Sequence, residues 1–325
     1  MKTILLTGAA GFIGFHTATA LLKRGDTVIG VDNLNPYYST KLKEDRLDQL
    51  KKQANFSFYK ANIADQPAIA KIYKENKIDV VCHLAAQAGV RYSLENPYAY
   101  IESNLQGTTV IFEEAKRAGV KQITYASSSS VYGKNTEAIF KESQVTDTPI
   151  SLYAATKKST ELLAHSYHHL FGLKMTGLRF FTVYGPWGRP DMFAFLLSKS
   201  ILENEPVKVF NEGKMYRDFT YIDDIVAGVI ASLDHPQAYE VFNLGGAKTT
   251  LLNDFIALVE KEMGGTAEKQ YLPLQPGDVL RTSADVGKAE ELLGWTPQVP
   301  LEQGVKNFCV WFKNYYPVLK KENAI

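Results

Sequence analysis

Residues 3–14 read Thr-Ile-Leu-Leu-Thr-Gly-Ala-Ala-Gly-Phe-Ile-Gly, and this stretch decides the fold. Its first five residues form an apolar, β-branched run that predicts a strand, Thr3–Thr7, and helical periodicity follows the last glycine. Gly8, Gly11 and Gly14 allow a tight turn and a close approach of the backbone. The unpaired N–H groups at the start of the helix suit a pyrophosphate. The stretch therefore predicts a dinucleotide-binding turn.

The residue after the second predicted strand, Thr27–Val31, is Asp32, which lies 18 residues past Gly14. A carboxylate here accepts hydrogen bonds from ribose hydroxyls and repels a 2′-phosphate, so we predict NAD rather than NADP. The alternative is an ordinary strand-to-helix turn with a solvated aspartate. The order of strand, glycines, helix, strand and acid favours the cofactor site.

The first half of the chain alternates β-branched runs with stretches of helical periodicity. This alternation predicts an α/β fold, a doubly wound parallel sheet of the Rossmann type with helices on both faces. The predicted strands are Thr3–Thr7, Thr27–Val31, Phe56–Tyr59, Asp79–His83, Gln122–Ala126 and Lys174–Phe180, and the predicted helices are Phe12–Arg24, Gln66–Glu75, Pro97–Ala118 and Leu152–Phe171.

This alternation stops near residue 181, where a loop rich in glycine and proline begins. We predict an NAD-binding Rossmann domain over 1–180, with returning segments near 222–246, and an interleaved, smaller α/β substrate domain over 181–325. The elements predicted after this point are helices at Phe193–Glu203, Leu252–Met263, Val286–Leu293 and Leu301–Tyr315, and strands at Pro206–Phe210 and Glu240–Leu244.

The composition excludes several classes of protein. Lys and Arg total 36 against 35 for Asp and Glu, so no global field attracts nucleic acid or an anionic membrane. Cys82 and Cys309 lie far apart in apolar contexts, which indicates reduced, buried thiols. The histidines show no metal-ligand spacing, and no apolar run approaches the roughly 18 residues of a membrane span. The chain opens directly into a strand without a signal peptide, so we predict a soluble cytoplasmic protein without a metal.

A candidate proton-transfer pair stands at Tyr153 and Lys157, four residues apart in a predicted helix and hence on one face. A nearby cation favours the phenolate of a tyrosine. Such a pair is common on exposed helices, so the inference depends on a second feature. Residues 127–130 are four serines that end the preceding strand, where ligands of open α/β sheets bind.

With these motifs in order, the sequence resembles the nucleotide-sugar epimerases and dehydratases of the extended short-chain dehydrogenase/reductase family, and most closely those that epimerise UDP-glucuronate. The resemblance covers nearly the whole chain. The segments that carry it are TGAAGFIG at 7–14, VDNLN at 31–35, HLAAQAGVRYS at 83–93, SSSSVYG at 127–133, YAATK at 153–157, RFFTVYGPWGRPDM at 179–192, RDFTYIDD at 217–224 and QPGDV at 275–279.

The resemblance implies an enzyme that holds NAD tightly and uses it transiently. Tyr153 would take the proton of the sugar 4-hydroxyl while the C4 hydride passes to the cofactor, and a 4-keto sugar would rotate before the hydride returns. Lys157 would lower the pKa of Tyr153 and bind ribose hydroxyls, and Ser128 would hydrogen-bond the 4-oxygen. Asn62 stands where the family usually has an aspartate, although its amide oxygen still accepts a hydrogen bond. The full set expected at the cofactor is Gly8, Gly11, Phe12, Ile13, Gly14, Asp32, Asn33, Asn62, Ile63, Leu84, Ala85, Ala86, Gln87, Asn104, Tyr153 and Lys157.

The serine run separates this chain from relatives with other chemistry. Family dehydratases carry Asp-Glu where Ser129 and Ser130 stand, and decarboxylases carry glutamate in place of Ser130. Hydroxyls at both positions favour simple epimerisation and offer donors to a sugar carboxylate. Thr182 replaces an asparagine usual in galactose-type epimerases, and Arg189 is the candidate for the uronate or the diphosphate.

The resemblance assigns the nucleotide to the second domain. Arg217 matches an arginine that neutralises the diphosphate, and Asp278 matches a residue that binds the uridine ribose. The role of Arg281 stays open between the diphosphate and solvent. By the same resemblance, Pro97–Ala118 and Leu152–Phe171 would pair across a two-fold axis in a homodimer.

Three functions remain as hypotheses. The first is reversible conversion of UDP-glucuronate to UDP-galacturonate. The second is 4-epimerisation of UDP-glucose or UDP-N-acetylglucosamine on the same machinery. The third, a non-catalytic NAD-binding regulator, would be marked by a lost tyrosine or lysine, whereas both Tyr153 and Lys157 are present.

Overall fold

The computed structural model describes residues 1–135, 137–274 and 280–322. Its centre is a seven-stranded sheet in the order β11-β6-β5-β4-β1-β2-β3, in which all neighbouring strands are parallel. The strands are β1 (Thr3–Thr7), β2 (Thr27–Asp32), β3 (Phe56–Lys60), β4 (Val80–His83), β5 (Gln122–Ser128), β6 (Lys174–Phe180) and β11 (Tyr239–Leu244). The predicted doubly wound sheet is confirmed.

Both faces of this sheet are buried, as the near-continuous apolar runs predict. Ile4 and Leu6 of β1 pack in one core with α1 (Phe12–Lys23) and α9 (Ile222–Asp234). Leu5 points to the other face, where α3 (Gln66–Glu75), α6 (Thr108–Arg117) and α7 (Leu152–Phe171) form a second core. The period-two alternation of a strand thus divides the core residues between two layers of helices.

The single helix predicted over Pro97–Ala118 is wrong. The chain instead forms α4 (Tyr92–Glu95), α5 (Pro97–Tyr100), a π-helical segment η1 (Ile101–Gly107) and then α6. The widened η1 turn contains the buried Asn104. The Asn104 side chain bonds the backbone of Gln87 and the hydroxyl of Thr156, contacts that a sequence pattern does not record. Such π-helical turns are frequent at functional sites.

Helix α2 (Thr40–Leu50) is not predicted by the sequence pattern. Its buried face combines three leucines with two charged residues, Lys43 and Arg46. Apolar periodicity finds a helix only where the buried side chains are apolar, so this one stays hidden.

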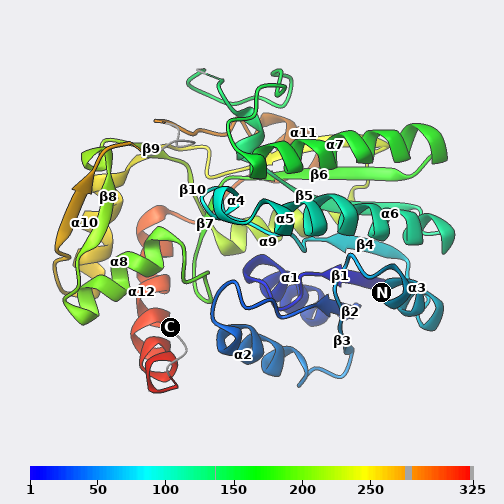
Figure 1. Cartoon of the computed structure of the whole chain (residues 1–325), viewed down its shortest axis with the longest axis horizontal. Helices are drawn as coiled ribbons and strands as arrows, with labels where there is room; N and C mark the ends of the chain where they lie inside the picture. Colours follow the sequence, from blue (N-terminus) through cyan, green and yellow to red (C-terminus); the bar gives the residue numbers. More distant parts are fainter. Residues whose placement is uncertain (136, 275–279, 323–325) are drawn as a thin grey trace.

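The remaining elements form a smaller unit at one end of the molecule, where Figure 1 shows α8, α10, α12 and β8 grouped beside the sheet. The strand pairs are β7 with β10, β8 with β13, and β9 with β12. The segments predicted to return near 222–246 are α9, which packs on α1, and β11, which pairs with β6. The elements here are α8 (Phe193–Glu203), α10 (Leu252–Met263), α12 (Leu301–Lys321), β7 (Thr182–Tyr184), β8 (Val207–Phe210), β9 (Tyr216–Arg217), β10 (Phe219–Tyr221), β12 (Thr250–Leu251) and β13 (Lys269–Leu272), with the 3-10 turn η3 (Asn211–Gly213). Two further elements pack on the central sheet and its helices: the 3-10 turn η2 (Ser129–Tyr132), which follows β5 and contacts α7, and α11 (Gly287–Leu293), which contacts β11 and α9.

The described residues contain neither a membrane-spanning helix nor a metal-binding cluster. No helix there has the length and apolar character to cross a membrane. No group of three or more His, Cys, Asp or Glu side chains there is placed to hold a metal ion.

Candidate active site

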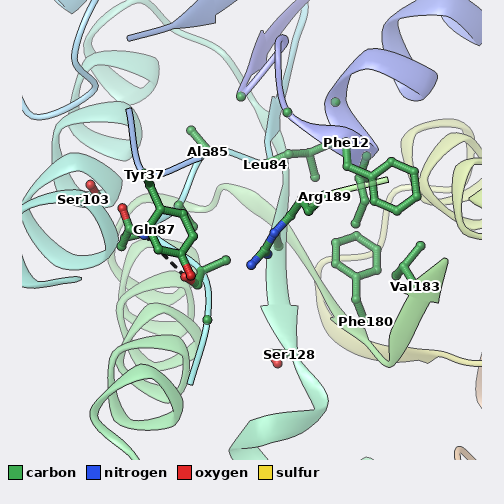
Figure 2. Close-up of a pocket in the computed structure, with 18 of the residues that line it drawn as sticks. Phe12, Tyr37, Leu84, Ala85, Gln87, Ser103, Ser128, Phe180, Val183 and Arg189 are labelled. Carbon is green, nitrogen blue, oxygen red and sulfur yellow. Dashed lines mark hydrogen bonds between the residues drawn. The ribbon is translucent and has the colours of Figure 1, made fainter. Parts of the chain in front are cut away.

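A cleft of about 430 Å³ opens at the carboxyl ends of β1, β2, β4 and β5, where open parallel sheets bind ligands. It brings together most of the side chains that the sequence predicts (Figure 2). The predicted residues that line it are Gly8, Gly11, Phe12, Ile13, Gly14, Asp32, Asn33, Ile63, Leu84, Ala85, Ala86, Gln87, Ser128, Ser129, Ser130, Tyr153, Lys157, Thr182 and Arg189.

The glycine-rich turn is a cradle that side chains would fill. Gly8 has a φ of +76°, and a Cβ there would lie 2.8 Å from the backbone nitrogen of Ala85. A Cβ on Gly14 would lie 2.0 Å from the carbonyl oxygen of Gly8. No side chain caps α1, whose N-cap is Gly11, so its first N–H groups face the cleft without a side-chain partner. The turn therefore fits a dinucleotide diphosphate.

Asp32 stands at the end of β2 and shapes the next part of the cleft. Its two carboxylate oxygens accept hydrogen bonds from the backbone N–H groups of Ala10 (3.0 Å) and Leu34 (2.8 Å). These bonds tie the glycine-rich turn to the β2–α2 loop. Each oxygen keeps a lone pair for a ribose hydroxyl.

The β2–α2 loop and α2 add lining residues that the sequence analysis does not single out, namely Asn35, Tyr37, Tyr38 and Lys43. The Lys43 ammonium lies 4.3 Å from the centre of the Tyr38 ring, and burial lowers its pKa to about 8, against the opposing charge of Asp32. A helical pattern that counts buried charged residues together with apolar ones would have predicted α2 and pointed to these residues.

Helix α7 carries Tyr153 and Lys157 into the cleft. The Ser151 hydroxyl caps the helix by accepting from the N–H of Ala154 at 3.1 Å, which fixes the start of the helix and its register. The Lys157 ammonium donates to the carbonyl of Ala126 at 2.8 Å. The tyrosine and the lysine therefore line one cleft from a single helix face.

The pKa values of Tyr153 and Lys157 both differ from the ordinary values of these side chains. Burial raises the pKa of Tyr153, and the Ser128 hydroxyl and the charge of Arg189 oppose that rise. Burial lowers the pKa of Lys157 to about 8, and the carboxylate of Glu161 opposes it. Arg179 holds Glu161 through two hydrogen bonds of 2.8 Å each. A buried carboxylate one turn along α7 thus helps Lys157 to keep its proton.

The serine run turns sharply at the end of β5. The Ser128 hydroxyl oxygen accepts from the N–H of Ser130 at 3.2 Å and so caps η2, and the two hydroxyls lie 3.2 Å apart. Ser127 differs, because its hydroxyl donates to Glu161 at 2.7 Å. Among the described residues that line the cleft, Asp32 is the one acid, and it belongs to the β2 end.

Arg189 points into the cleft, with Tyr37 and Gln87 on one side and Phe180 on the other (Figure 2). Its Nε and Nη2 donate to the two oxygens of Asp191 at 2.9 and 2.6 Å. The Tyr37 hydroxyl donates to Asp191 at 3.0 Å. Burial raises the pKa of Asp191, but its bonds to Arg189 outweigh burial and leave the pKa below its ordinary value. Asp191 therefore engages Nε and Nη2 of the guanidinium.

Two predicted cofactor residues do not line the cleft. Asn104 is buried behind it, where its side chain accepts from the N–H of Gln87 (2.8 Å) and donates to the carbonyl of the same residue (3.0 Å). Asn62 donates to Glu102 at 2.8 Å and accepts from the N–H of Ala64 at 3.0 Å. Asn104 thus positions the β4 loop, and the Asn62 oxygen already has one donor.

Arg217 and Arg281 also lie outside the lining. Arg217 is on β9 and donates to the carbonyl of Tyr216 and the sulfur of Met215. Arg281 lies over the Tyr216 ring and donates to the hydroxyl of Thr249 at 3.3 Å. Asp278 lies outside the described residues.

The fold and the cleft define a Rossmann-type dinucleotide-binding protein with a tyrosine and a lysine at its ligand site. Residues 4–245 match the NAD dependent epimerase/dehydratase family, and the chain belongs to this family.

Individual relatives cover nearly the whole chain. An uncharacterized protein of Methanocaldococcus jannaschii is 52% identical over 313 residues, which are 96% of each chain. The UDP-glucuronate 4-epimerase of Thermodesulfobacterium geofontis is 48% identical over 321 residues, 98% of this chain and 99% of the relative. A crystal structure of the Bacillus cereus UDP-glucuronic acid 4-epimerase with UDP-glucuronic acid and NAD has a TM-score of 0.91 at 37% identity, and the match covers 97% of this chain and 100% of the other.

We expect Gly14→Ala to lose NAD. The added methyl would meet the Gly8 carbonyl and push the turn away from α1. If the about 1–3 kcal/mol of overpacking falls on the bound state, affinity drops by roughly 5- to 150-fold. The measurement is the NAD content of the purified protein and its affinity by calorimetry. Gly287→Ala is the control, because its methyl meets only a side-chain oxygen of Asp285, at 3.1 Å. Equal NAD content in the two variants would contradict the role of the turn.

Proposed function

We propose that this chain interconverts UDP-glucuronate and UDP-galacturonate by inverting C4, with NAD as a tightly held cofactor. The observation that carries the proposal is the wall formed by Ser128, Ser129 and Ser130 beside Tyr153, a wall of hydroxyls without the acid that elimination or decarboxylation would use. The names of the Thermodesulfobacterium relative and the Bacillus structure support the same substrate.

The cofactor end of the cleft is assigned to residues of β1, β2, β4 and α7. The glycine-rich turn would receive the diphosphate, and Asp32 with Asn33 would receive the adenosine ribose. Ile63 and the β4 segment from Leu84 to Gln87 would line the dinucleotide. Bound NAD would supply the acceptor for the C4 hydride and the source from which the hydride returns.

Proton transfer is assigned to Tyr153. Burial raises the pKa of Tyr153, and in the complex the charges of Lys157 and of an oxidised nicotinamide would offset that rise and favour the phenolate. The phenolate would take the proton of the sugar 4-hydroxyl, and the phenol would give it back to the 4-oxygen. Because the hydride also returns to C4, the cycle would have no net redox change. Ser128 hydrogen-bonds the 4-oxygen. Lys157 binds ribose hydroxyls and adds positive charge near the phenolate. Its pKa of about 8 keeps it largely protonated at neutral pH.

The sugar end is assigned to Ser129, Ser130, Thr182 and Arg189. The hydroxyls donate to the uronate carboxylate, and the Nη1 group of Arg189 offers a charge-assisted donor. The nucleotide is assigned to residues 181–325, with Arg217 at the diphosphate and Asp278 at the uridine ribose. The two proposed domains, 1–180 with 222–246 and the rest of 181–325, thus meet at the reacting carbon.

The first experiment follows the anomeric and H4 proton signals of UDP-glucuronate by NMR, with purified protein and no added NAD. We expect UDP-galacturonate to form, because the site holds its cofactor and carries the epimerase residues. Parallel samples contain UDP-glucose and UDP-N-acetylglucosamine. Faster turnover of a neutral sugar would replace the uronate with the second hypothesis, and a pentose product would show that the serine wall permits decarboxylation.

Tyr153→Phe is expected to retain the fold and NAD and to lose turnover by at least about 10²-fold, the usual scale of acid–base contributions. Steady-state kinetics and NAD content measure this. Tyr73→Phe is the matched control, since it removes a buried tyrosine hydroxyl that bonds the carbonyl of Ile111 far from the cleft. Normal turnover in the Tyr153 variant would remove this residue from the mechanism.

A homodimer is proposed for the face formed by α4, α5, η1 and α7. Large apolar side chains there are exposed to solvent, and monomers rarely leave such a face bare. The exposed residues of this face are Leu94, Tyr98, Ile101, Leu162, Leu170 and Phe171.

The buried reduced thiols Cys82 and Cys309 support a cytoplasmic location.

Light scattering is expected to give a dimer for the wild type and a monomer for Leu162→Glu, because a carboxylate at the centre of an apolar interface is left without a partner. Val318→Glu on α12 is the control, being similarly exposed but remote from this face, and should stay dimeric. A monomeric wild type would overturn the proposal.

A further inference from the structure

Arg46 of α2 is fully buried behind the cleft, with none of its surface exposed. All four hydrogens of its two terminal nitrogens are used. Nη1 donates to the carbonyl of Ala10 at 2.8 Å and to the hydroxyl of Tyr38 at 3.0 Å. Nη2 donates to the carbonyls of Trp187 and Gly188. One guanidinium therefore joins three segments of chain that are distant in sequence.

These acceptors are all neutral. Within the described parts of the chain, no carboxylate forms an ion pair with Arg46, and its Nε has no hydrogen-bond partner. A buried cation without a counter-ion is costly to the fold, so a buried charge is weak evidence for a purely stabilising role. A planar fork with donors in fixed directions is what distinguishes arginine from lysine. The four directed hydrogen bonds of the guanidinium, rather than a gain in stability, explain why an arginine stands at this position.

The segments that Arg46 joins are the two ends of the cleft. Ala10 belongs to the glycine-rich turn, and Trp187 and Gly188 directly precede Arg189 at the sugar end. The backbone at Trp187 is left-handed, with a φ of +60°, so this loop needs external support. His16 of α1 adds a second contact, 2.9 Å from the carbonyl of Pro186.

We infer that Arg46 is a positioning residue, which fixes the loop that carries Arg189 to the turn that receives the cofactor diphosphate and so sets the distance between the sugar and the cofactor. Arg46 itself does not line the cleft. The inference rests on the proposed function only in the part that concerns the sugar nucleotide. The mechanical part, in which Arg46 holds the loop at 185–192, is independent of any substrate.

The mechanical part is tested by hydrogen exchange of Arg46→Met without substrate. We expect the amides of residues 185–192 to exchange at least about tenfold faster than in the wild type, because local opening of the loop loses its restraint. Ile72→Ala is the control, since this buried residue lies in the core on the other face of the sheet and its loss destabilises the fold without touching the loop. Equal exchange at 185–192 in the two variants would overturn the inference.

The functional part is tested by a double-mutant cycle of Arg46→Met and Arg189→Met on kcat/KM, with the UDP-sugar that the wild type converts. If Arg46 acts through Arg189, it lowers kcat/KM by about 10²-fold in the wild type, the scale of a misplaced substrate contact, and by less than about threefold once Arg189 is gone. Equal losses in both backgrounds would show that Arg46 only supports the fold.

Two more conservative variants test the inference if Arg46→Met does not fold. Arg46→Lys keeps the charge and loses the fork, and Tyr38→Phe removes one acceptor of the guanidinium. Both are expected to speed exchange at 185–192 by less than Arg46→Met, and wild-type exchange in both would overturn the inference. A wild type that ignores UDP-glucuronate would overturn the proposed substrate and leave this exchange result intact.

Discussion

Contact between backbones at the glycine-rich turn is the constraint on which the structure depends. Gly14 of α1 lies against the carbonyl of Gly8, and Gly8 lies against the backbone of Ala85 after β4, with no room for a Cβ at either glycine. This packing sets the start of α1 and brings the β1 and β4 loops together. Asp32 then fastens the β2 loop to the same turn through the N–H of Ala10. The cofactor end of the cleft is therefore built mainly from backbone atoms.

The reacting end depends instead on side chains whose charges are held in place. Glu161 is fixed by Arg179 and helps Lys157 to remain charged, while Asp191 fixes two nitrogens of Arg189. The serine wall carries no formal charge. Under the proposed function, such a cleft would hold an anionic sugar mainly through oriented donors, since its cations are already partly compensated.

The parts of the fold that follow strong local patterns could be predicted from the sequence. The strands of the central sheet, α3, α7, α8 and α10 appear at the expected residues, because buried parallel strands and amphipathic helices have distinct periods. Helix α2 could not be found, since Lys43 and Arg46 occupy its buried face. The η1 turn depends on Asn104 bonding to distant residues, and the two-residue strands β9 and β12 are too short to have a pattern.

The residues of the site likewise divide into those that a sequence motif predicts and those that no motif predicts. Motif residues such as Tyr153, Ser128 and Asp32 lie in the cleft as expected, whereas Tyr37, Tyr38 and Lys43 enter it through the missed helix and its loop. Asn104, which the resemblance places at the cofactor, is buried outside the cleft lining and bonds the backbone of Gln87. No sequence spacing records that one side chain holds another segment in place.

The main core runs without interruption from Ile4 and Phe15 beneath the sheet to Phe255 and Phe312 in the smaller unit. Because the two regions share one apolar core, we expect them to unfold together rather than as separate domains. Separate expression of residues 1–180 would leave much of that core facing water. In this protein the two ends of the cleft therefore belong to one folding unit.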